Sequence, residues 1–242
     1  MFVVFRLLPL GQFLRWLVCL SLSAWDVLKY QSLGPVDRKF GECFAIRANH
    51  RWLYFENTAF GVMREIFGHQ CYVSPHDLAN AKHILDLGAN GGAFTLFALA
   101  YAPHARVHAV EAQAHLAEAL KKNIQRNGFE TRTTWETSLV GGNCNHWTQK
   151  FCEQNPSLKE FSIQDYLAKV GTCDFLKCDI EGAEYAFFSG DLSWLSSIRK
   201  IALEYHGDIG DALCLRDLIQ KSGFDVQQEP HGRFGYFFCQ RI

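Results

Sequence analysis

The alternation of apolar and polar positions is clearest in the middle of the chain. Residues 83–87 form a short apolar run, a glycine-rich turn follows, and residues 93–101 continue as an almost wholly apolar segment. A buried strand, a tight turn and a buried helix in this order begin a βαβ unit. The helix is expected to end before Pro103, and residues 106–111 are expected to form the second strand.

The segments after residue 111 continue this alternation of helices and strands. Residues 115–126 place apolar side chains on one face of a helix, and Gly128 follows where a C-terminal cap belongs. Residues 141–160 look irregular and polar. Short apolar runs and turn residues predict the remaining elements: strands at 131–135, 173–179 and 201–207, a helix at 213–219, and a closing hairpin at 224–229 and 234–241.

The first third of the chain carries a weaker pattern. Residues 52–55 predict a short strand, residues 59–67 a short helix, and Ser74-Pro75 a helix start. A chain of 242 residues suits one α/β domain with an extension. We therefore expect an N-terminal helical extension and cap over residues 1–75, followed by one α/β domain over residues 76–242.

Residues 2–29 are unusually apolar. Their longest run without a charge, from Trp16 to Trp25, is too short to span a bilayer. Three interpretations remain open: an amphipathic helix that packs on the domain, a helix that lies on a membrane surface, or a signal peptide with a loose cleavage site at 21–24. Unpaired cysteines oppose export, so we expect a cytoplasmic protein, with peripheral membrane contact as the alternative.

Charge and cysteine content exclude several classes of protein. The formal net charge is −1 and Lys and Arg form no run, which opposes DNA or RNA as the main partner. The nine cysteines include no C-x-x-C pair and no compact Cys/His cluster. This pattern indicates reduced, mostly buried thiols rather than a disulfide framework or a zinc site.

The glycine-rich turn differs from two common phosphate-binding turns. In Asp86-x-Gly88-x-x-Gly91, Asn90 replaces the second glycine of the dinucleotide fingerprint, and no Lys-Ser/Thr follows as in a P-loop. The turn is similar instead to the first motif of S-adenosylmethionine-dependent methyltransferases. Glu111 ends the second strand, where a carboxylate can accept hydrogen bonds from both ribose hydroxyls of a nucleoside. The alternative is a plain turn beside a solvated strand-end acid.

Acidic side chains follow two later strands. Asp179, Glu181 and Glu184 lie within six residues after the fourth predicted strand, and Glu204 and His206 end the fifth. The negative charges of carboxylates crowded in this way repel one another unless a cation or a bound proton lies among them. Open α/β sheets bind ligands at the carboxyl ends of their strands, so these residues form a candidate site, although each alone could be structural.

With these residues in view, the chain resembles the FkbM family of S-adenosylmethionine-dependent methyltransferases. The resemblance implies a Rossmann-like α/β fold with a seven-stranded, mostly parallel sheet, one antiparallel strand and helices on both faces. It also implies O-methylation of sugars, glycolipids or secondary metabolites. The matching positions are Asp86–Gly91, Val110-Glu111, Asn123, Asn127, Lys177–Glu184 and Glu204–His206.

These positions give an expected division of roles. Asp179 and His206 are the candidate bases at an acceptor hydroxyl, and a histidine with an ordinary pKa of roughly 6.5 can take a proton at neutral pH. Glu181 and Glu204 are expected beside them in the catalytic group. The residues expected to bind S-adenosylmethionine are Asp86, Gly88, Ala89, Asn90, Gly91, Glu111, Ser138 and Asp179. A divalent metal is compatible with the acids, but the sequence does not decide it.

The sequence leaves the acceptor and two rival functions open. A small molecule, glycan or glycolipid is the expected acceptor, and residues 2–29 are the segment expected to contact a membrane surface. One rival is a nucleic-acid methyltransferase, which the near-neutral charge opposes. The other is a module that binds S-adenosylmethionine without catalysing a reaction.

Overall fold

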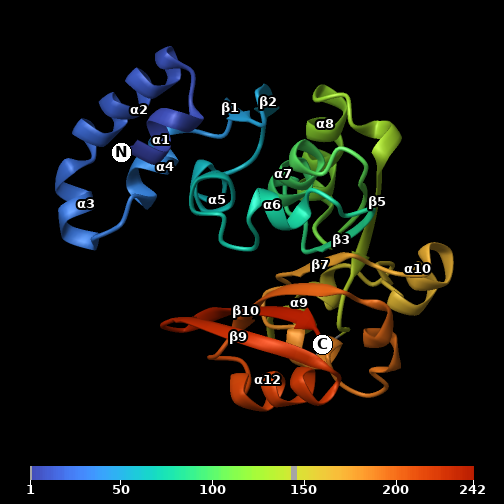
Figure 1. Cartoon of the computed structure of the whole chain (residues 1–242). Helices are drawn as coiled ribbons and strands as arrows, with labels where there is room; N and C mark the ends of the chain where they lie inside the picture. The colour runs from blue at the N-terminus through green and yellow to red at the C-terminus, as the bar shows by residue number, and fades with distance from the viewer. Residues whose placement is uncertain (1, 143–145) are drawn as a thin grey trace.

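The computed structural model describes residues 2–142 and 146–242. Its centre is an eight-stranded sheet with the strand order β6-β5-β4-β3-β7-β8-β10-β9 (Figure 1). Strand β10 runs antiparallel to both of its neighbours, and the other pairs are parallel. The strands are β3 (His83–Leu87), β4 (Arg106–Glu111), β5 (Thr133–Leu139), β6 (Lys159–Glu160), β7 (Phe175–Cys178), β8 (Lys200–His206), β9 (Phe224–His231) and β10 (Phe234–Arg241).

The expected Rossmann-like architecture is confirmed, with one correction to the number of strands. Seven strands were expected, and β6 adds an eighth at the edge beside β5. Only two residues of β6 pair, so it is too short to show the period-two pattern by which strands are recognised.

Several element boundaries also differ from the prediction. Strand β5 begins at Thr133 rather than at residue 131, because a short 3₁₀ helix occupies Glu130–Arg132. The strand then continues to Leu139, beyond the predicted end at residue 135. Within 141–160, where irregular chain was expected, the structure has β6 and a helix, α9 (His146–Gln154). Residues 143–145 lie outside the described part of the chain.

Side chains alternate between two cores on the two faces of the sheet. Ile84 and Phe175 point into one core, whereas Leu85 and Leu176, the next residues along the same strands, point into the other. The second core is covered by helices that follow β6, and the first by helices that precede β5. Besides α9 and the 3₁₀ helix at Glu130–Arg132, the helices described in the C-terminal two thirds are α6 (Pro75–Leu78), α7 (Ala93–Tyr101), α8 (Ala114–Arg126), α10 (Ile163–Val170), α11 (Glu184–Phe187), η3 (Ser193–Ser197) and α12 (Ala212–Lys221).

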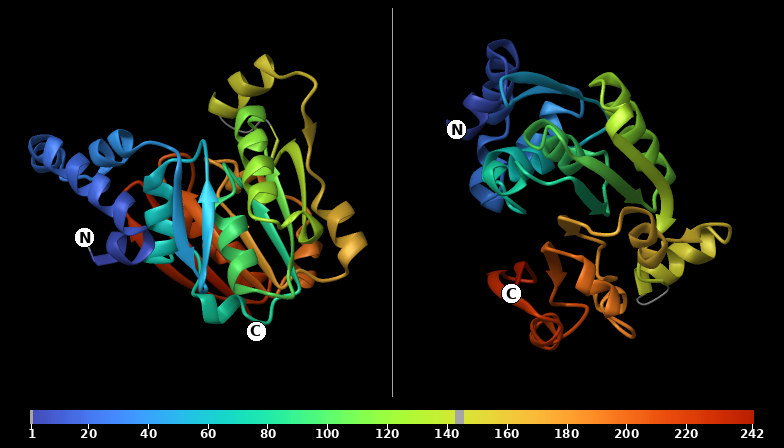
Figure 2. Two further views of the ribbon diagram at one scale, coloured as in Figure 1. Left: turned by 90° about the horizontal axis from the view of Figure 1, so that it is seen from above. Right: turned by 45° about the vertical axis from the view of Figure 1, so that its right-hand side comes forward.

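The N-terminal segment packs on the first core and forms several short elements. In place of one amphipathic helix over residues 2–29, three helices occur, and α2 and α3 project away from the sheet (Figure 2). No helix in the described part of the chain is long and apolar enough to cross a bilayer. The elements are α1 (Phe2–Leu7), α2 (Leu10–Leu22), α3 (Ala24–Tyr30), α4 (Gly34–Phe40), the hairpin β1 (Phe44–Ala48) and β2 (Arg51–Phe55), α5 (Phe60–Met63) and the π-helix η1 (Arg64–His69).

Two buried asparagines on α8 attach the β1–β2 hairpin to the domain. The side-chain amide of Asn123 donates to the carbonyl oxygens of Glu56 and Gly91, and its oxygen accepts from the backbone N–H of Glu56. Asn127 binds both the N–H and the carbonyl of Tyr54 in the same way. The two side chains thus make the hydrogen bonds that a neighbouring strand would otherwise make to the end of β2. Asn123 also connects this backbone to the glycine turn.

We expect Asn123→Ala to lower the free energy of unfolding by about 2–4 kcal/mol, because it leaves several buried backbone groups without partners. Denaturant titration measures this difference. Gln125→Ala, an exposed position on the same helix, is the matched control and should change stability by less than about 0.5 kcal/mol. Equal effects of the two changes would contradict the role given to Asn123.

Candidate active site

A pocket of about 680 Å³ opens at the carboxyl ends of the parallel strands. It is lined by the turn after β3 and by the ends of β4, β5, β7 and β8. Helices α5 and η1, with the residues just after η1, form one wall of the pocket, and α9 forms part of another wall. The carboxyl edge of an open α/β sheet is the usual place for a ligand, and here it is also where the acidic residues gather.

The turn after β3 requires glycine at two positions for different reasons. Gly88 has a φ of +73°, and a Cβ atom there would lie 1.7 Å from the carbonyl oxygen of Asp179. At Gly91, a Cβ atom would lie 2.4 Å from Thr58 Oγ1. Gly88 therefore lets two strand ends approach each other, whereas Gly91 makes room for the N-terminal segment rather than for a ligand.

Glu111 is buried at the end of β4 and holds the turn in place. One of its oxygens accepts the N–H of Asn90 and the other accepts the N–H of Gln113, each at 2.8 Å. Burial raises the pKa of Glu111, although these two hydrogen bonds oppose the change. The carboxylate is thus not a solvated strand end, and its remaining lone pairs face the pocket.

Beneath the turn lies a buried ion pair. Lys177 Nζ is 3.2 Å from Asp86 Oδ1 and donates to the carbonyl oxygens of Leu87 and Gly88. Thr95 donates to the other oxygen of Asp86. Burial lowers the pKa of Lys177, but the negative charges of Asp86 and Asp179 outweigh burial and raise it.

Tyr72 joins two carboxyl groups of the pocket. Its hydroxyl oxygen lies 2.8 Å from Asp179 Oδ2 and 2.9 Å from Glu204 Oε2. A phenol carries one proton, so both contacts are hydrogen bonds only when one carboxyl is protonated and donates to the phenol oxygen. Burial and the charge of Asp179 raise the pKa of Glu204 to about 7, so Glu204 can carry this extra proton near neutral pH.

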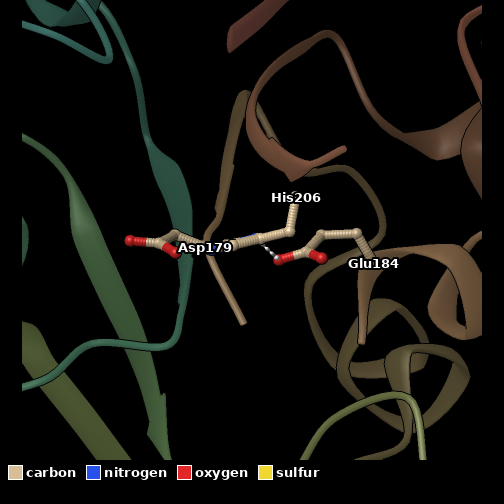
Figure 3. A group of neighbouring side chains, drawn as sticks. All are labelled: Asp179, Glu184 and His206. Carbon is tan, nitrogen blue, oxygen red and sulfur yellow. Dashed lines mark ion pairs between the residues drawn. The ribbon is translucent and has the colours of Figure 1, made fainter. Parts of the chain in front are cut away.

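His206 is surrounded by acids. Its Nδ1 lies 3.3 Å from Glu184 Oε1, its Nε2 lies 3.6 Å from Glu181 Oε2, and Figure 3 shows it converging with Asp179 and Glu184. Burial lowers the pKa of His206, but the close contact with Glu184 and the nearby negative charges together raise it to about 9. The expectation of an ordinary histidine pKa is therefore wrong, and the imidazole is protonated at neutral pH.

The same group has the spacing of a metal site. Asp179, Glu184 and His206 each offer one ligand atom, and these atoms lie within 4.8 Å of one another. Oxygen and imidazole ligands suit several divalent ions. A proton on His206 supplies positive charge to the same acids, so the geometry, like the sequence, does not decide between a metal ion and a proton.

Most of the residues chosen from the sequence line this pocket, and two do not. Asp86 lies beneath the turn, where it pairs with Lys177, and Gly91 packs against Thr58. Glu181 is largely exposed at the rim and has a φ of +55°, which is uncommon for a residue with a side chain. The residues that do line the pocket are Gly88, Ala89, Asn90, Glu111, Ser138, Asp179, Glu181, Glu204 and His206.

Three parts of the lining were not found from the sequence. Tyr72 belongs to a stretch without a recognisable motif, and it meets Asp179 across 107 positions of the chain. The π-helix η1 adds a buried isoleucine and an acid, and the pattern around residue 65 gave only a short helix. Helix α9, which was also missed, adds a third part of the lining. The lining residues missed in these three regions are Val62, Glu65, Ile66, Cys71, Tyr72, Thr148, Lys150, Phe151 and Gln154.

Comparison with known proteins identifies a family. A family model described as the methyltransferase FkbM domain matches residues 86–226. No curated protein matches the sequence.

Solved structures resemble the fold at low sequence identity. An O-methyltransferase family protein from Burkholderia thailandensis is 12% identical, with a TM-score of 0.46 over 68% of this chain and 52% of that one. The Methanococcus jannaschii fibrillarin pre-rRNA processing protein is 11% identical, with a TM-score of 0.48 over 70% and 69%. The 16S rRNA N2 G1207 methyltransferase of T. thermophilus is 14% identical, with a TM-score of 0.49 over 83% and 50%. The chain thus spans about half the length of the first of these proteins.

We expect Lys177→Met to lower the free energy of unfolding by about 3–5 kcal/mol, because it leaves the carboxylate of Asp86 buried without a counter-charge. Denaturant titration measures the loss, and the double variant Asp86→Asn/Lys177→Met should recover most of it. Lys200→Met, which breaks a partly exposed pair with Asp77, is the control and should cost less than about 1 kcal/mol. If Lys177→Met costs no more than the control, the buried pair is not a stabilising centre.

Proposed function

Because the chain belongs to the FkbM methyltransferase family, we propose that it transfers the methyl group of S-adenosylmethionine to a hydroxyl of a sugar, glycolipid or secondary metabolite. The main support is a single observation. The glycine turn and Glu111 lie in the same pocket as the Tyr72–Asp179–Glu204 group, so a donor site adjoins a set of groups that can accept a proton.

The donor side of the pocket is suited to a nucleoside with a positive charge. Glu111 presents a buried carboxylate to ribose hydroxyls, and Ser138 borders the expected position of the adenine. A sulfonium placed over the turn would face the carboxylates of Asp179 and Glu204. NAD and ATP carry phosphates instead, which these acids would repel.

The acceptor side supports a neutral hydroxyl compound. Carboxylates accept hydrogen bonds from hydroxyl groups and disfavour an acceptor that bears phosphate or carboxylate groups. Glu65 on η1 adds a further acid to this side, and burial raises its pKa. Val62 and Ile66 add apolar surface beside it, as the face of a sugar ring or a hydrocarbon portion requires.

S-Adenosylmethionine bound here would supply an electrophilic methyl group and retain the electron pair of the broken carbon–sulfur bond. The protein must hold the acceptor oxygen in line with that bond and take its proton. His206 already carries a proton at neutral pH, so we assign proton acceptance to Asp179. Tyr72 orients Asp179 through their hydrogen bond, and the positive charge of His206 lies close to the same carboxyl group.

We expect Glu111→Gln to weaken binding of S-adenosylhomocysteine by about 1.5–3 kcal/mol, because charge-assisted hydrogen bonds to the ribose are lost. Calorimetry with S-adenosylhomocysteine, NAD and ATP measures this affinity and the choice of ligand. Glu118→Gln, an exposed acid on α8, should leave the affinity unchanged. Tighter binding of NAD than of S-adenosylhomocysteine would overturn the donor assignment.

We expect Asp179→Asn to lower the turnover by about 10²-fold or more while the affinity for S-adenosylhomocysteine is retained, since the proton acceptor is lost. Tyr72→Phe should also lower turnover, by a smaller factor. Turnover is measured as label passed from radiolabelled donor to fractionated lipid, glycan and small-molecule extracts, with and without a chelator.

The same assay distinguishes the alternatives. Label in bulk RNA would favour a nucleic-acid methyltransferase, and donor binding without a labelled acceptor would favour a binding module. If Asp179→Asn lowers the melting temperature and the donor affinity but not the turnover per folded molecule, Asp179 is structural. Loss of activity with the chelator that added Mg²⁺ or Mn²⁺ restores would show that a metal is required.

A further inference from the structure

Helices α2 and α3 carry many exposed apolar side chains. On α2 these residues recur every four positions, which places them along one side of the helix. Helix α3 adds an exposed tryptophan, and both helices project away from the sheet (Figure 2). The apolar side chains of the two helices that are more than half exposed are Leu10, Leu14, Val18, Leu22, Trp25, Leu28 and Tyr30. We call this set the α2–α3 face.

The other side of α2 is also apolar and is already packed. Trp16 and Cys19 are buried there, with Phe13, Leu17 and Leu20 partly buried beside them. Apart from Gln12, Arg15 and Ser21, α2 is thus apolar on both its packed and its exposed sides, and a helix of this kind is normally covered on both. The described chain covers one side of α2 and leaves the other open, so the α2–α3 face is suited to a partner outside the described chain.

The charges around this face indicate what kind of partner it contacts. Residues 1–40 contain five Lys or Arg and two Asp or Glu, although the whole chain has a formal net charge of −1. One of the two acids, Asp37, is buried in an ion pair with Arg64. Lys29 lies against Tyr30, and Lys39 donates to the carbonyl oxygen of Leu22, so cations border the apolar side chains.

We propose that the α2–α3 face lies in the interface of an anionic lipid bilayer. Leucine, tryptophan and tyrosine on one face, with lysine and arginine at its edge, are typical of helices that lie in the membrane plane. A second copy of this chain would bring together two segments that both carry excess positive charge, which opposes a dimer through this face.

This placement bears on the acceptor. Helix α1 packs on η1 and α4 packs on α5, and the α5–η1 region supplies the Val62–Tyr72 wall of the pocket. A segment held at the bilayer thus also forms the acceptor side of the site. We infer an amphiphilic acceptor, with its hydroxyl at the pocket and its hydrocarbon part in the membrane. This substrate class rests on the proposed function, whereas membrane binding does not.

Flotation tests the proposal with vesicles of phosphatidylcholine alone and of phosphatidylcholine mixed with phosphatidylglycerol. The full chain should float with the mixed vesicles, less so at high salt. Leu14→Glu/Leu22→Glu should lower the bound fraction by at least about 10-fold, because both leucines leave the apolar layer. Leu213→Glu, at an exposed leucine on α12, is the matched control and should float as the wild type does.

Calorimetry with S-adenosylhomocysteine should give the same affinity for all three proteins, which shows that each is folded. The proposal is overturned if the wild type stays unbound with both vesicles, or if the double variant floats equally well. A dimer in sedimentation that the double variant loses, without vesicle binding, would show that a second copy covers the face. Vesicle binding without transfer of label to any acceptor would contradict the proposed function and leave the membrane contact standing.

Discussion

The buried ammonium of Lys177 is the constraint on which the rest of the site depends. It lies between Asp86, the carbonyl oxygens at the end of β3 and the ring of Tyr72, whose centroid is 5.4 Å away. One positive charge therefore fixes two neighbouring strands, the glycine turn and a residue of the N-terminal segment. A buried charge persists only when it is paired and hydrogen-bonded, so these elements must assemble together or not at all.

Around this cation the pocket has more acidic than basic side chains, and bound protons offset part of the excess negative charge. Glu204 holds a proton more readily than usual, and His206 keeps its proton at neutral pH. Asp179 contacts the Tyr72 hydroxyl and lies close to His206, and it is the carboxyl group to which we assign proton acceptance. A cationic donor would add positive charge among these acids, so binding the donor should also favour loss of the extra proton at the Tyr72 contacts.

The sequence predicted the elements that local patterns specify. Strand β4 and helix α7 were predicted to the residue, because each is an apolar run bounded by glycine, proline or a charged residue. Helix α9 was missed because it is short and mostly polar and follows a stretch rich in glycine and asparagine, which is typical of irregular chain. The raised pKa of His206 could not be predicted either. It depends on Glu184, whose orientation toward the ring is set by the turn after β7.

Tyr72 shows where the limits of a family motif lie. The family model begins at residue 86, and the motif residues within it supply the proposed donor side and the carboxyl groups of the pocket. The wall on the acceptor side comes from residues before the match, and those residues are joined to helices that carry an uncovered apolar face. A core that recognises the donor can stay constant while the segment before it determines which acceptor enters. The identity of the acceptor is therefore to be sought in the N-terminal segment rather than in the motifs that identify the family.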